Sequence, residues 1–483
     1  MYLYPDDRFT NAFKAYDIRG RLGSEITEAL AYYVGRAYVV WLRSEGLNPR
    51  NIAVGSDVRT TSAALKSALS QGIRDEAVNV YDIGLCGTEE VYHAVAFAEP
   101  EPGTTFDGGI MVTASHNPID YNGLKLVREG ARPISAADGL SEIKNLIRHQ
   151  ALPVPDSSNC AGHFRTSFAT EYLQHLLGYI DVGALKPLKI VVNAGNGAVG
   201  PALDGIEQFL PVELIKINHE PNGGFPNGIP NPMLVEQQQI TAQAVLDHKA
   251  DLGLAWDGDF DRCFFFSEKG EFIEGYYLVG VLAEALISKQ PTNSDLDTPV
   301  KIVHDPRLIW NTQAICHELG GEAIQSVCGH SFIKKIMREQ DAAYGGEMSA
   351  HHYFRDFAYC DSGMIPWLLI IELLSKTGKT LSEMIGDRTQ RFACSGEINI
   401  SVLNADETLL AVRNRYEKQA CDIDETDGIG MDMGSWRFNL RKSNTEPLVR
   451  LNVETTAGTA LLSEVTSDVK TTIHELEASS SKA

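Results

Sequence analysis

The chain has 483 residues, too many for one hydrophobic core, so its length predicts three or four domains. Hydrophobic residues make up 43% and charged residues 22% of the chain, which is typical of globular proteins. The formal net charge of −22 argues against nucleic acid or an anionic membrane surface as the main partner.

Targeting and redox signals are weak throughout the chain. The N-terminal stretch MYLYPDDRFTNAFKAYDIRG lacks a basic segment followed by an apolar one, so we expect no secretory signal. The most apolar helix-like stretch, GMIPWLLIIELL (363–374), contains an acid and is too short to span a bilayer. The eight cysteines form no CxxC pair of the zinc or redox type. We therefore expect reduced thiols in a cytoplasmic protein.

Three sets of β-branched runs follow one another along the chain, and each run ends in a turn rich in Gly, Asn or Asp. The first runs of the sets lie at 51–59, 188–197 and 300–307. The second runs lie at 78–90, 212–225 and 323–334, and the third runs at 108–118, 251–262 and 341–352. Because helical patterning separates the runs, the repetition predicts parallel, buried strands in three related α/β units.

The expected fold class is therefore α/β, with mixed but mostly parallel sheets arranged around a central cleft. We place the three related domains at residues 1–158, 159–270 and 271–392. Residues 435–456 predict two strands around a turn, followed by a helix from about 459 to 478. This pattern indicates a smaller α+β domain over residues 393–483. Ligands in open α/β sheets bind beyond the carboxyl ends of strands, so the loops after the third runs are expected to line the cleft.

The sequence DGDFDR (257–262) follows a predicted strand. In an extended backbone Asp257, Asp259 and Asp261 would point to one side, where three carboxylates repel unless a cation lies among them. Oxygen ligands without His or Cys favour Mg²⁺. An EF-hand loop is rejected, because its sixth position requires Gly and is occupied here by Arg262. Mg²⁺ keeps water or phosphate oxygens in its shell, so the loop predicts a phosphorylated partner, which Arg262 would also bind.

Two later loops carry polar groups suited to a sugar phosphate. Arg437, Arg441, Lys442 and Arg450 lie within fourteen residues around the turn RKSNTEP (441–447), which adds hydroxyl and amide donors. Guanidinium groups together with hydroxyl and amide donors on short side chains are typical of phosphate binding. A basic turn exposed to solvent would show the same sequence pattern. GEMSAHHYF (346–354) offers a carboxylate and a hydroxyl for sugar hydroxyls, and alone it is ambiguous.

Ser115, in TASHNP (113–118), matches no hydrolase pattern, because the nucleophile elbow requires GxSxG. Taken alone, it would be an ordinary serine at the end of a strand. Its meaning depends on the other loops.

Six segments in chain order resemble the α-D-phosphohexomutases, and most closely the bacterial phosphomannomutases of GDP-mannose synthesis. They are KAYDIRG (14–20), TASHNP (113–118), DYNGLKL (120–126), DGDFDR (257–262), GEMSAHHYF (346–354) and RKSNTEP (441–447). The resemblance covers nearly the whole chain. It implies an isomerase that interconverts mannose 6-phosphate and mannose 1-phosphate through a phosphoserine and a hexose 1,6-bisphosphate, which also serves as the activator.

The resemblance also implies roles for individual residues. Ser115 would carry the phosphoryl group and, with Asp257, Asp259 and Asp261, bind Mg²⁺. Lys125 matches the general acid/base, Arg19 and Arg262 match residues near the transferring phosphate, and His330 matches a residue of proton-transfer role. The residues expected to bind the other phosphate are Arg441, Ser443, Asn444, Thr445 and Arg450. Those expected to bind the sugar are Glu347, Ser349 and His351.

Several alternatives stay open on the sequence. A phosphoglucomutase or a dual mannose/glucose enzyme fits the same loops, because GEMSAHHYF does not settle the stereochemistry at C2. A phosphoglucosamine mutase fits less well, since that branch has a different sugar loop. A Mg²⁺-dependent phosphatase with an aspartyl nucleophile would release inorganic phosphate without needing Ser115. A sensor of sugar phosphates would bind without turnover. The chain is compatible with a monomer or a homodimer.

Overall fold

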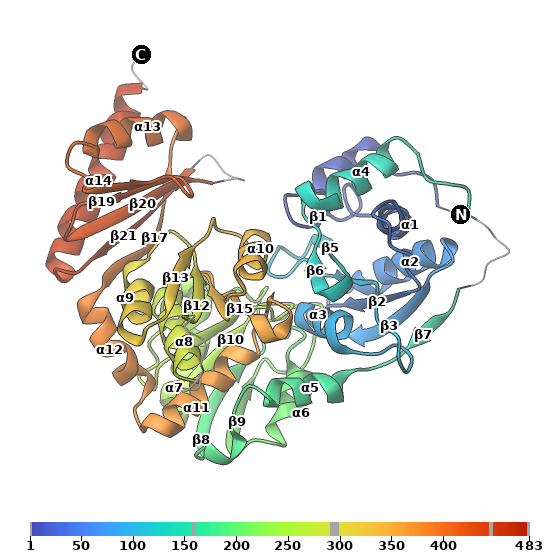
Figure 1. The fold of residues 1–483 in the computed structure, drawn as a ribbon, viewed down its shortest axis with the longest axis horizontal. Coiled ribbons are helices and arrows are strands. Elements are labelled where there is room, and N and C mark those ends of the chain that lie inside the picture. Colours follow the sequence, from blue (N-terminus) through green and yellow to red (C-terminus); the bar gives the residue numbers. More distant parts are fainter. Residues whose placement is uncertain (1, 156–160, 290–298, 444–447, 481–483) are drawn as a thin grey trace. The chain divides into compact units, whose positions relative to one another are not determined.

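The computed structural model describes residues 2–155, 161–289, 299–443 and 448–480 (Figure 1). The chain forms two compact units. Unit 1 comprises Met1–Phe272 and His351–Gly378, and unit 2 comprises Ile273–Ala350 and Lys379–Ala483.

Unit 1 begins with a seven-stranded mixed sheet in the order β1-β5-β4-β2-β3-β7, with β6 beside β5. The strands are β1 (Ile18–Arg21), β2 (Asn51–Ser56), β3 (Asn79–Leu85), β4 (Gly108–Val112), β5 (Tyr121–Arg128), β6 (Arg132–Pro133) and β7 (His163–Arg165). Its helices are α1 (Glu28–Ser44), α2 (Ser62–Asp75), α3 (Thr88–Phe97) and α4 (Ser141–Arg148). Strand β2 is buried along its whole length, as expected for a central strand covered on both faces.

A second sheet of unit 1 has the order β11-β10-β8-β9. It contains β8 (Leu188–Asn193), β9 (Val212–Ile217), β10 (Leu252–Trp256) and β11 (Cys263–Phe266), with helices α5 (Ala169–Leu177), α6 (Gly200–Glu207) and α7 (Val235–His248). The later segment of unit 1 adds an antiparallel pair, β15 (His352–Phe354) and β16 (Cys360–Asp361), and helix α11 (Ile365–Thr377). This helix is the apolar stretch noted in the sequence, and its buried residues belong to the core of the unit.

Unit 2 contains a parallel three-stranded arrangement in the order β13-β12-β14. The strands are β12 (Lys301–His304), β13 (Glu322–Gln325) and β14 (Tyr344–Gly346). The helices of this part are α8 (Gly275–Lys289), α9 (Trp310–Leu319), α10 (His330–Gln340) and α12 (Leu381–Arg391). Helix α12 starts at a capping box in which Thr380 and Glu383 satisfy each other's backbone N–H groups.

The three sets of runs share one topology. In each set the first run forms the middle strand, the second run pairs with it on one side, and the third run pairs on the other side. The parallel orders are β3-β2-β4, β9-β8-β10 and β13-β12-β14. The expected α/β class and its mostly parallel sheets are therefore confirmed, and the loops singled out in the sequence follow the corresponding strands β4, β10 and β14.

The last sheet is antiparallel, with the order β17-β21-β20-β19-β18. Its elements are β17 (Ala393–Ser401), α13 (Ala405–Tyr416), β18 (Asp422–Asp424), β19 (Ile429–Asp432), β20 (Trp436–Lys442), β21 (Leu448–Thr455) and α14 (Thr459–Ser480). Helices α13 and α14 cover one face (Figure 1), where Phe438, Leu440, Leu451 and Val453 form the core. The two strands and the following helix agree with the prediction for residues 435–478.

The opposite face of this sheet is buried but polar. Because residues alternate between faces along a strand, Arg437 and Asn439 lie opposite to the apolar core, and their cross-strand partners are Glu454 and Asn452. Arg437 donates to Glu454 at 2.8 Å and to the carbonyl oxygens of Pro306 and Arg307 in the same unit. A row of paired polar groups therefore leads along the sheet toward the loop after β20.

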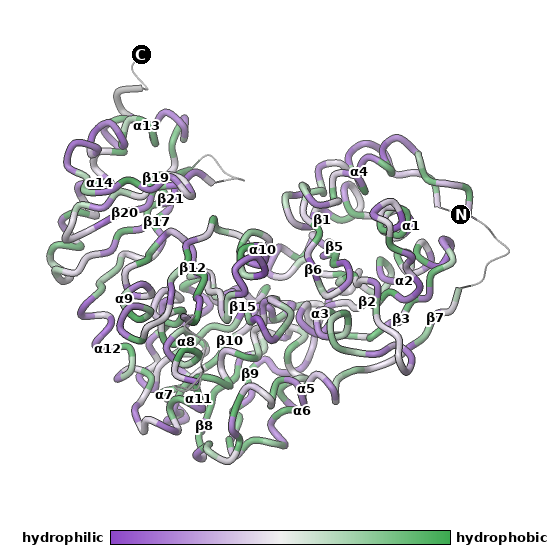
Figure 2. The backbone as a smooth tube through the Cα atoms, viewed as in Figure 1, coloured by the Kyte–Doolittle hydropathy of each residue, from purple (hydrophilic) through white to green (hydrophobic). Residues whose placement is uncertain are grey.

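Hydrophobic stretches along the backbone are interrupted at short intervals by hydrophilic ones (Figure 2). Among the helices in the described ranges, none combines the length and the apolar character needed to cross a bilayer. The cysteines described are free thiols, and Cys86, Cys263, Cys316 and Cys360 are buried.

Candidate functional site

Ser115 lies in the loop directly after β4 and is 3% exposed. Its φ of 48° lies in the left-handed region, which is costly for a serine and persists only where the surroundings enforce it. The Oγ donates a hydrogen bond to Asp257 Oδ2 at 2.6 Å and lies 3.0 Å from His116 Nδ1. The serine hydroxyl is thus fixed against a carboxylate from the loop after β10.

Arg59 enforces this loop conformation. The guanidinium donates to four backbone carbonyl oxygens at 2.5–3.1 Å, those of Ser115, Asn117, Pro118 and Tyr121. Asp57 supports the same loop through Thr113. The Thr113 Oγ1 donates a hydrogen bond to Asp57 Oδ2 and accepts one from the Ser115 N–H at 2.8 Å. The residues that position Ser115 therefore follow β2, the central strand of the sheet.

The three aspartates converge through a turn. We expected an extended backbone, but residues 257–262 form the tight connection between β10 and β11, and Phe260 has a φ of 45°. The extended-backbone premise was wrong, although Asp257, Asp259 and Asp261 do lie together. Gly258 is required in this turn, since a Cβ there would lie 2.7 Å from the Ser115 carbonyl oxygen.

Two cationic side chains neutralise part of the aspartate cluster. Lys125 Nζ, on β5, donates to Asp259 Oδ2 at 2.7 Å and to Asp261 Oδ2 at 2.5 Å. Arg262 donates from Nη2 to Asp257 Oδ2 at 2.7 Å and contacts His116 Nδ1. Burial alone would lower the pKa of Lys125, but the Asp259 and Asp261 carboxylates raise it well above its usual value. Lys125 is therefore held as a cation.

The aspartate cluster retains capacity for a metal ion. One oxygen from each of Asp257, Asp259 and Asp261 lies within 4.8 Å of the others. The three Oδ1 atoms are buried and accept no hydrogen bond from the described part of the chain. Buried carboxylate oxygens without donors are costly, so the donor set fits a hard cation of the Mg²⁺ type. Burial and the neighbouring Asp259 carboxylate raise the pKa of Asp261, which reports the same surplus of negative charge.

Two further predicted residues lie in unit 1. Arg19, on β1, donates to Asp17 Oδ2 and to Asn117 Oδ1, both at 2.6 Å, so it contacts the serine loop through Asn117. His351 Nε2 lies 3.7 Å from Asp261 Oδ1. The structure thus brings Arg19, Ser115, Lys125, Arg262 and His351 to the aspartate cluster.

The other predicted residues lie in unit 2. Glu347 follows β14, is buried, and accepts from the backbone N–H of Gly329 at 3.0 Å. Gly329 precedes α10, whose first residue is His330. Ser349 is half-buried two residues after Glu347. Glu347 and Ser349 therefore belong to the loop after β14, and His330 begins the helix that follows β13.

Arg307 is the centre of charge among these loops. It is 5% exposed and pairs with Asp305 through two hydrogen bonds of 3.0 and 2.7 Å. Its Nη2 lies 3.9 Å from Glu347 Oε1, and its Nη1 lies 3.5 Å from Glu397 Oε2. Arg307 thus connects the loop after β14 with strand β17.

The arginines around residue 441 separate into different environments. Arg441 and Arg450 both pair with Glu397, whereas Arg437 is buried against Glu454 and the exposed Lys442 pairs with Asp406. The Ser443 N–H donates to the Leu448 carbonyl oxygen at 3.0 Å, which closes the loop between β20 and β21. Asn444 and Thr445 lie outside the described residues.

Reasoning from the sequence missed Arg59, Arg307 and Glu397. A signal for the two arginines was present, because both follow an aspartate by two residues after the first strand of a set, in GSDVR and VHDPR. The local geometry is the same, since the Arg59 N–H donates to Asp57 Oδ1 and the Arg307 N–H to Asp305 Oδ1, each at 3.0 Å.

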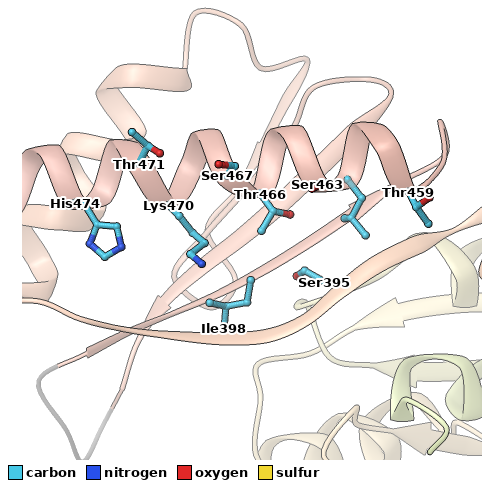
Figure 3. Close-up of a pocket in the computed structure, with 10 residues that line it drawn as sticks. Ser395, Ile398, Thr459, Ser463, Thr466, Ser467, Lys470, Thr471 and His474 are labelled. Carbon is cyan, nitrogen blue, oxygen red and sulfur yellow. The ribbon is translucent and has the colours of Figure 1, made fainter. Parts of the chain in front are cut away.

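A separate groove of about 600 Å³ lies between α14 and β17. Figure 3 shows side chains of α14 and β17 facing one another across it, and six of the ten lining residues carry hydroxyl groups. None of the predicted site residues that the structure describes lines this groove. It is a surface feature of unit 2 distinct from the loops described above.

Four family profiles match the chain in order. They are alpha/beta/alpha domains I, II and III of phosphoglucomutase/phosphomannomutase, over residues 10–153, 170–270 and 274–392, and the C-terminal domain over residues 397–471.

Whole-chain comparisons give the same result. A phosphomannomutase of Salmonella montevideo is 53% identical over 462 residues, which covers 95% of this chain and 97% of that protein. A protein of Xanthomonas campestris pv. campestris named "Phosphohexose mutases" is 52% identical over 458 residues, covering 95% and 98%. The X-ray crystal structure of a phosphoglucomutase/phosphomannomutase family protein from Burkholderia thailandensis superposes with a TM-score of 0.85 at 28% identity, covering 99% and 98%.

Proposed function

The chain belongs to the phosphoglucomutase/phosphomannomutase family, and from this premise we propose that it interconverts mannose 6-phosphate and mannose 1-phosphate. The reaction is an isomerisation that proceeds through a phosphoserine at residue 115 and a hexose 1,6-bisphosphate. The preference for mannose is supported by the name of the Salmonella relative at 53% identity.

The observation that carries this proposal is the environment of Ser115. Its hydroxyl is buried, held at a positive φ by the Arg59 contacts, and aimed at Asp257 beside two further carboxylates. A serine that served only packing would not need a strained backbone beside three negative charges. A serine that carries and releases a phosphoryl group needs a fixed position and strong local electrostatics.

In the proposed transfer, a sugar hydroxyl oxygen attacks the phosphorus of phosphoserine 115. The new P–O bond forms as the bond from phosphorus to Ser115 Oγ breaks; the Lys125 ammonium group gives a proton to Oγ, and the resulting amine takes the proton of the attacking hydroxyl. Lys125 is the proposed proton carrier, since its ammonium group lies at the carboxylates that border the serine. Arg262 and Arg19 would orient the transferring phosphate. The bisphosphate then turns over and returns its other phosphoryl group to Ser115.

We propose Mg²⁺ as the cofactor, held by Asp257, Asp259, Asp261 and an oxygen on Ser115. When bound, the ion would neutralise charge on the transferring phosphate and act as a Lewis acid. The buried Oδ1 atoms of the three aspartates are the groups available to it.

Unit 2 is the proposed source of substrate recognition. Arg441, Arg450, Ser443, Asn444 and Thr445 would bind the phosphate that is not being transferred, and Glu347 and Ser349 the sugar hydroxyls. His330 would assist proton transfer, and His351 of unit 1 would contact the substrate. Because the bisphosphate binds in two orientations, these contacts must serve either end of the molecule.

The remaining expectations are proposals of the same kind. The domain limits are 1–158, 159–270, 271–392 and 393–483, and the product supplies GDP-mannose synthesis in the cytoplasm. Hexose 1,6-bisphosphate would act as the activator, and hexose phosphates are the partners of a monomer or homodimer that binds no nucleic acid.

The test is an isomerisation assay of the purified protein with Mg²⁺ and a trace of hexose 1,6-bisphosphate. Mannose, glucose and glucosamine 1-phosphates are compared at equal concentration. The proposal predicts the highest kcat/KM with mannose 1-phosphate and no release of inorganic phosphate. A higher kcat/KM with glucose 1-phosphate would assign a phosphoglucomutase, and net phosphate release would indicate a phosphatase.

A further inference from the structure

Arg441 and Arg450 form a cross-strand pair of like charges. They are directly opposite each other in the register of β20 and β21, and both side chains are largely buried. Like charges opposite one another destabilise a sheet, so this pair requires a negative partner.

Glu397 is that partner. Strand β17 pairs with β21 so that Asn399 lies opposite Arg450, which places Glu397, two residues earlier, on the same face and diagonal to Arg450. The Glu397 Oε2 accepts from Arg441 Nη2 at 2.7 Å, and Oε1 accepts from Arg450 Nη1 at 3.3 Å. Arg307 adds a third guanidinium, 3.5 Å from Oε2. One carboxylate therefore serves three arginines.

The charges of this cluster balance without a ligand. Arg307, Arg441 and Arg450 contribute three positive charges, and Asp305, Glu347 and Glu397 contribute three negative ones. Burial alone would raise the pKa of Glu397, but the three arginines lower it below its usual value, so the group is an anion. An arriving phosphate dianion would therefore meet a cluster that is already neutral.

Hydrogen-bond donors nevertheless remain in excess. The Nε–H groups of Arg441 and Arg450 are buried and have no acceptor among the described residues. Buried donors without acceptors are costly. The arginine cluster is thus balanced in charge, but its N–H groups can still donate to further oxygen atoms. The two oxygens of the Glu397 carboxylate are too few to pair with all of them.

We propose that Glu397 acts as an internal substitute for the substrate phosphate. In the absence of substrate it keeps Arg441 and Arg450 in their binding positions, and in its presence it competes with the phosphate for the same guanidinium groups. This inference rests on the proposed function of Arg441 and Arg450 in phosphate binding. Glu397 is a positioning residue, because it acts through the two arginines.

The competition has a use in the proposed cycle. The first phosphate group of the bisphosphate must dissociate from the arginines so that the other phosphate group can bind there. Very tight phosphate binding would therefore slow turnover. A resident carboxylate lowers the net affinity for either phosphate by offering the arginines another partner. Glu397 therefore favours exchange of the two phosphate groups at the arginines over long retention of either one.

The first experiment measures binding of inorganic phosphate to the full-length protein by calorimetry. Replacing Glu397 with Gln (Glu397→Gln) keeps the shape of the side chain and removes its charge. We expect phosphate to bind at least about tenfold more tightly, since like-charge repulsion is relieved and the arginines lose a competitor. A structural role alone predicts the reverse, because loosened arginines would bind phosphate more weakly. Unchanged or weaker binding overturns the proposal.

The matched control is Glu318→Gln. Glu318, on α9 of the same unit, also bridges two arginines, Arg388 at 2.9 Å and Arg391 at 2.8 Å, and lies outside the cluster. The Glu318→Gln substitution removes the same charge from the protein, so it shows any general electrostatic effect on phosphate binding. We expect its phosphate affinity and activity to equal those of the wild type.

A second variant keeps the test decisive if Glu397→Gln folds poorly. Glu397→Asp retains the charge but shortens the reach toward Arg441 and Arg450. Its phosphate affinity should lie between those of the wild type and the Gln variant. Affinity equal to or below that of the wild type contradicts the inference.

Steady-state kinetics supply the final readout. With mannose 1-phosphate, Glu397→Gln should lower both KM and kcat, because the bisphosphate is held longer in one orientation. A raised KM with unchanged kcat would contradict this inference. If the wild type shows no mutase activity, the proposed function fails, whereas the calorimetric comparison still tests the competition between Glu397 and phosphate.

Discussion

The two units bury charge clusters of opposite character. In unit 1, Asp257, Asp259 and Asp261 leave three buried oxygens without donors, and in unit 2, Arg441 and Arg450 leave two buried Nε–H groups without acceptors, counting the described residues only. Each cluster already contains a resident group of the opposite charge. Lys125 bridges Asp259 and Asp261 in the first, and Glu397 bridges Arg441 and Arg450 in the second.

The difference between the clusters shows what each still lacks. The aspartates need a cation with several coordination positions, because one ammonium group and one guanidinium do not reach all their oxygens. The arginines need an anion with more than two oxygens, because a carboxylate does not reach all their N–H groups. The ligands proposed for the two clusters, a metal ion and a phosphate, would meet these two requirements. The predictions below disturb one cluster at a time.

The largest effect is expected from Ser115→Ala, which removes the proposed phosphoryl carrier beside the aspartate cluster. Mutase activity should fall by at least about a thousandfold, as expected when a covalent nucleophile is lost. Folding should persist, since the change removes one oxygen atom. Intact-mass measurement should show a phosphorylated fraction in the wild type that the variant lacks.

A control for this change is Ser141→Ala, which removes a hydroxyl that donates to the Ala136 carbonyl oxygen at the start of α4. Its activity and phosphorylated fraction should match those of the wild type. Near-normal turnover by Ser115→Ala would exclude residue 115 as the carrier.

The next effect concerns the cation. Asp259→Asn keeps the size of the side chain but removes one of the three carboxylates, so Mg²⁺ should bind more weakly. We expect kcat to fall by roughly 10²- to 10³-fold, the range typical for loss of one electrostatic contact to a transition state. A Mg²⁺ titration of activity checks this, with the exposed Asp247→Asn as the control. Wild-type activity that survives EDTA would rule out the metal assignment.

The sequence predicted the aspartate cluster better than the arginine cluster, for a physical reason. Asp257, Asp259 and Asp261 lie in one turn, so their proximity follows from chain connectivity even though the expected extended backbone was wrong. Glu397 and Arg441 are far apart in the chain, and only the register of β17, β20 and β21 brings them together. Arg307 reaches Glu397 from the loop after β12. A glutamate in an acidic chain gives no local signal of that contact. The Asp-x-Arg pattern of residues 57–59 and 305–307 did give one, but its meaning depends on the carbonyl oxygens and carboxylates that the fold supplies.

A third change weakens the arginine cluster. Arg441→Ala removes a charge-assisted contact worth roughly 1.5–3 kcal/mol, so KM for the sugar phosphate should rise by about 10- to 150-fold. More hexose 1,6-bisphosphate should also escape into solution, because the intermediate depends on the same contact while it turns over. A coupled enzymatic assay measures the released bisphosphate.

The neighbouring Lys442→Ala provides the control, since Lys442 is exposed and pairs with Asp406. It should leave KM and leakage unchanged. The phosphorylated fraction at Ser115 should persist in both variants. Loss of phosphoserine in Arg441→Ala without increased leakage would contradict the division of roles between the two clusters.

The smallest effect is expected on the pH dependence of stability. It tests whether buried groups outside the aspartate cluster contribute to the acid sensitivity of unit 1. His93 and Glu89 lie one turn apart on α3, and both are buried. Burial lowers the pKa of His93 to about 3, with a smaller contribution from His175. Burial also raises the pKa of Glu89 to about 8, although hydrogen bonds from Tyr172, Gly363 and Ser362 oppose the shift. The two groups therefore affect stability with opposite signs.

The pH windows follow from these shifts. The neutral His93 stabilises the fold fully above its unfolded pKa of about 6.5, and this contribution is lost as pH falls toward 3. The protonated Glu89 stabilises the fold fully below about 4.3, and this contribution is lost as pH rises toward 8. Between these two unfolded pKa values, the slopes of stability against pH from His93 and Glu89 cancel.

His93→Phe keeps an aromatic ring among Phe97, Tyr172 and Phe357 and removes one of the two titrations. Between pH 8 and pH 5 the His93 contribution falls by about 2 kcal/mol, at about 1.4 kcal/mol per pH unit below about 6.5, while the Glu89 contribution rises. The variant keeps only the Glu89 titration, so its free energy of unfolding should change by about 2 kcal/mol more favourably than that of the wild type over this interval. Denaturant unfolding at both pH values, with EDTA present, measures the difference. If the free energy of unfolding changes equally in the variant and the wild type between pH 8 and pH 5, His93 is not the group responsible, and the carboxylate cluster becomes the first to examine.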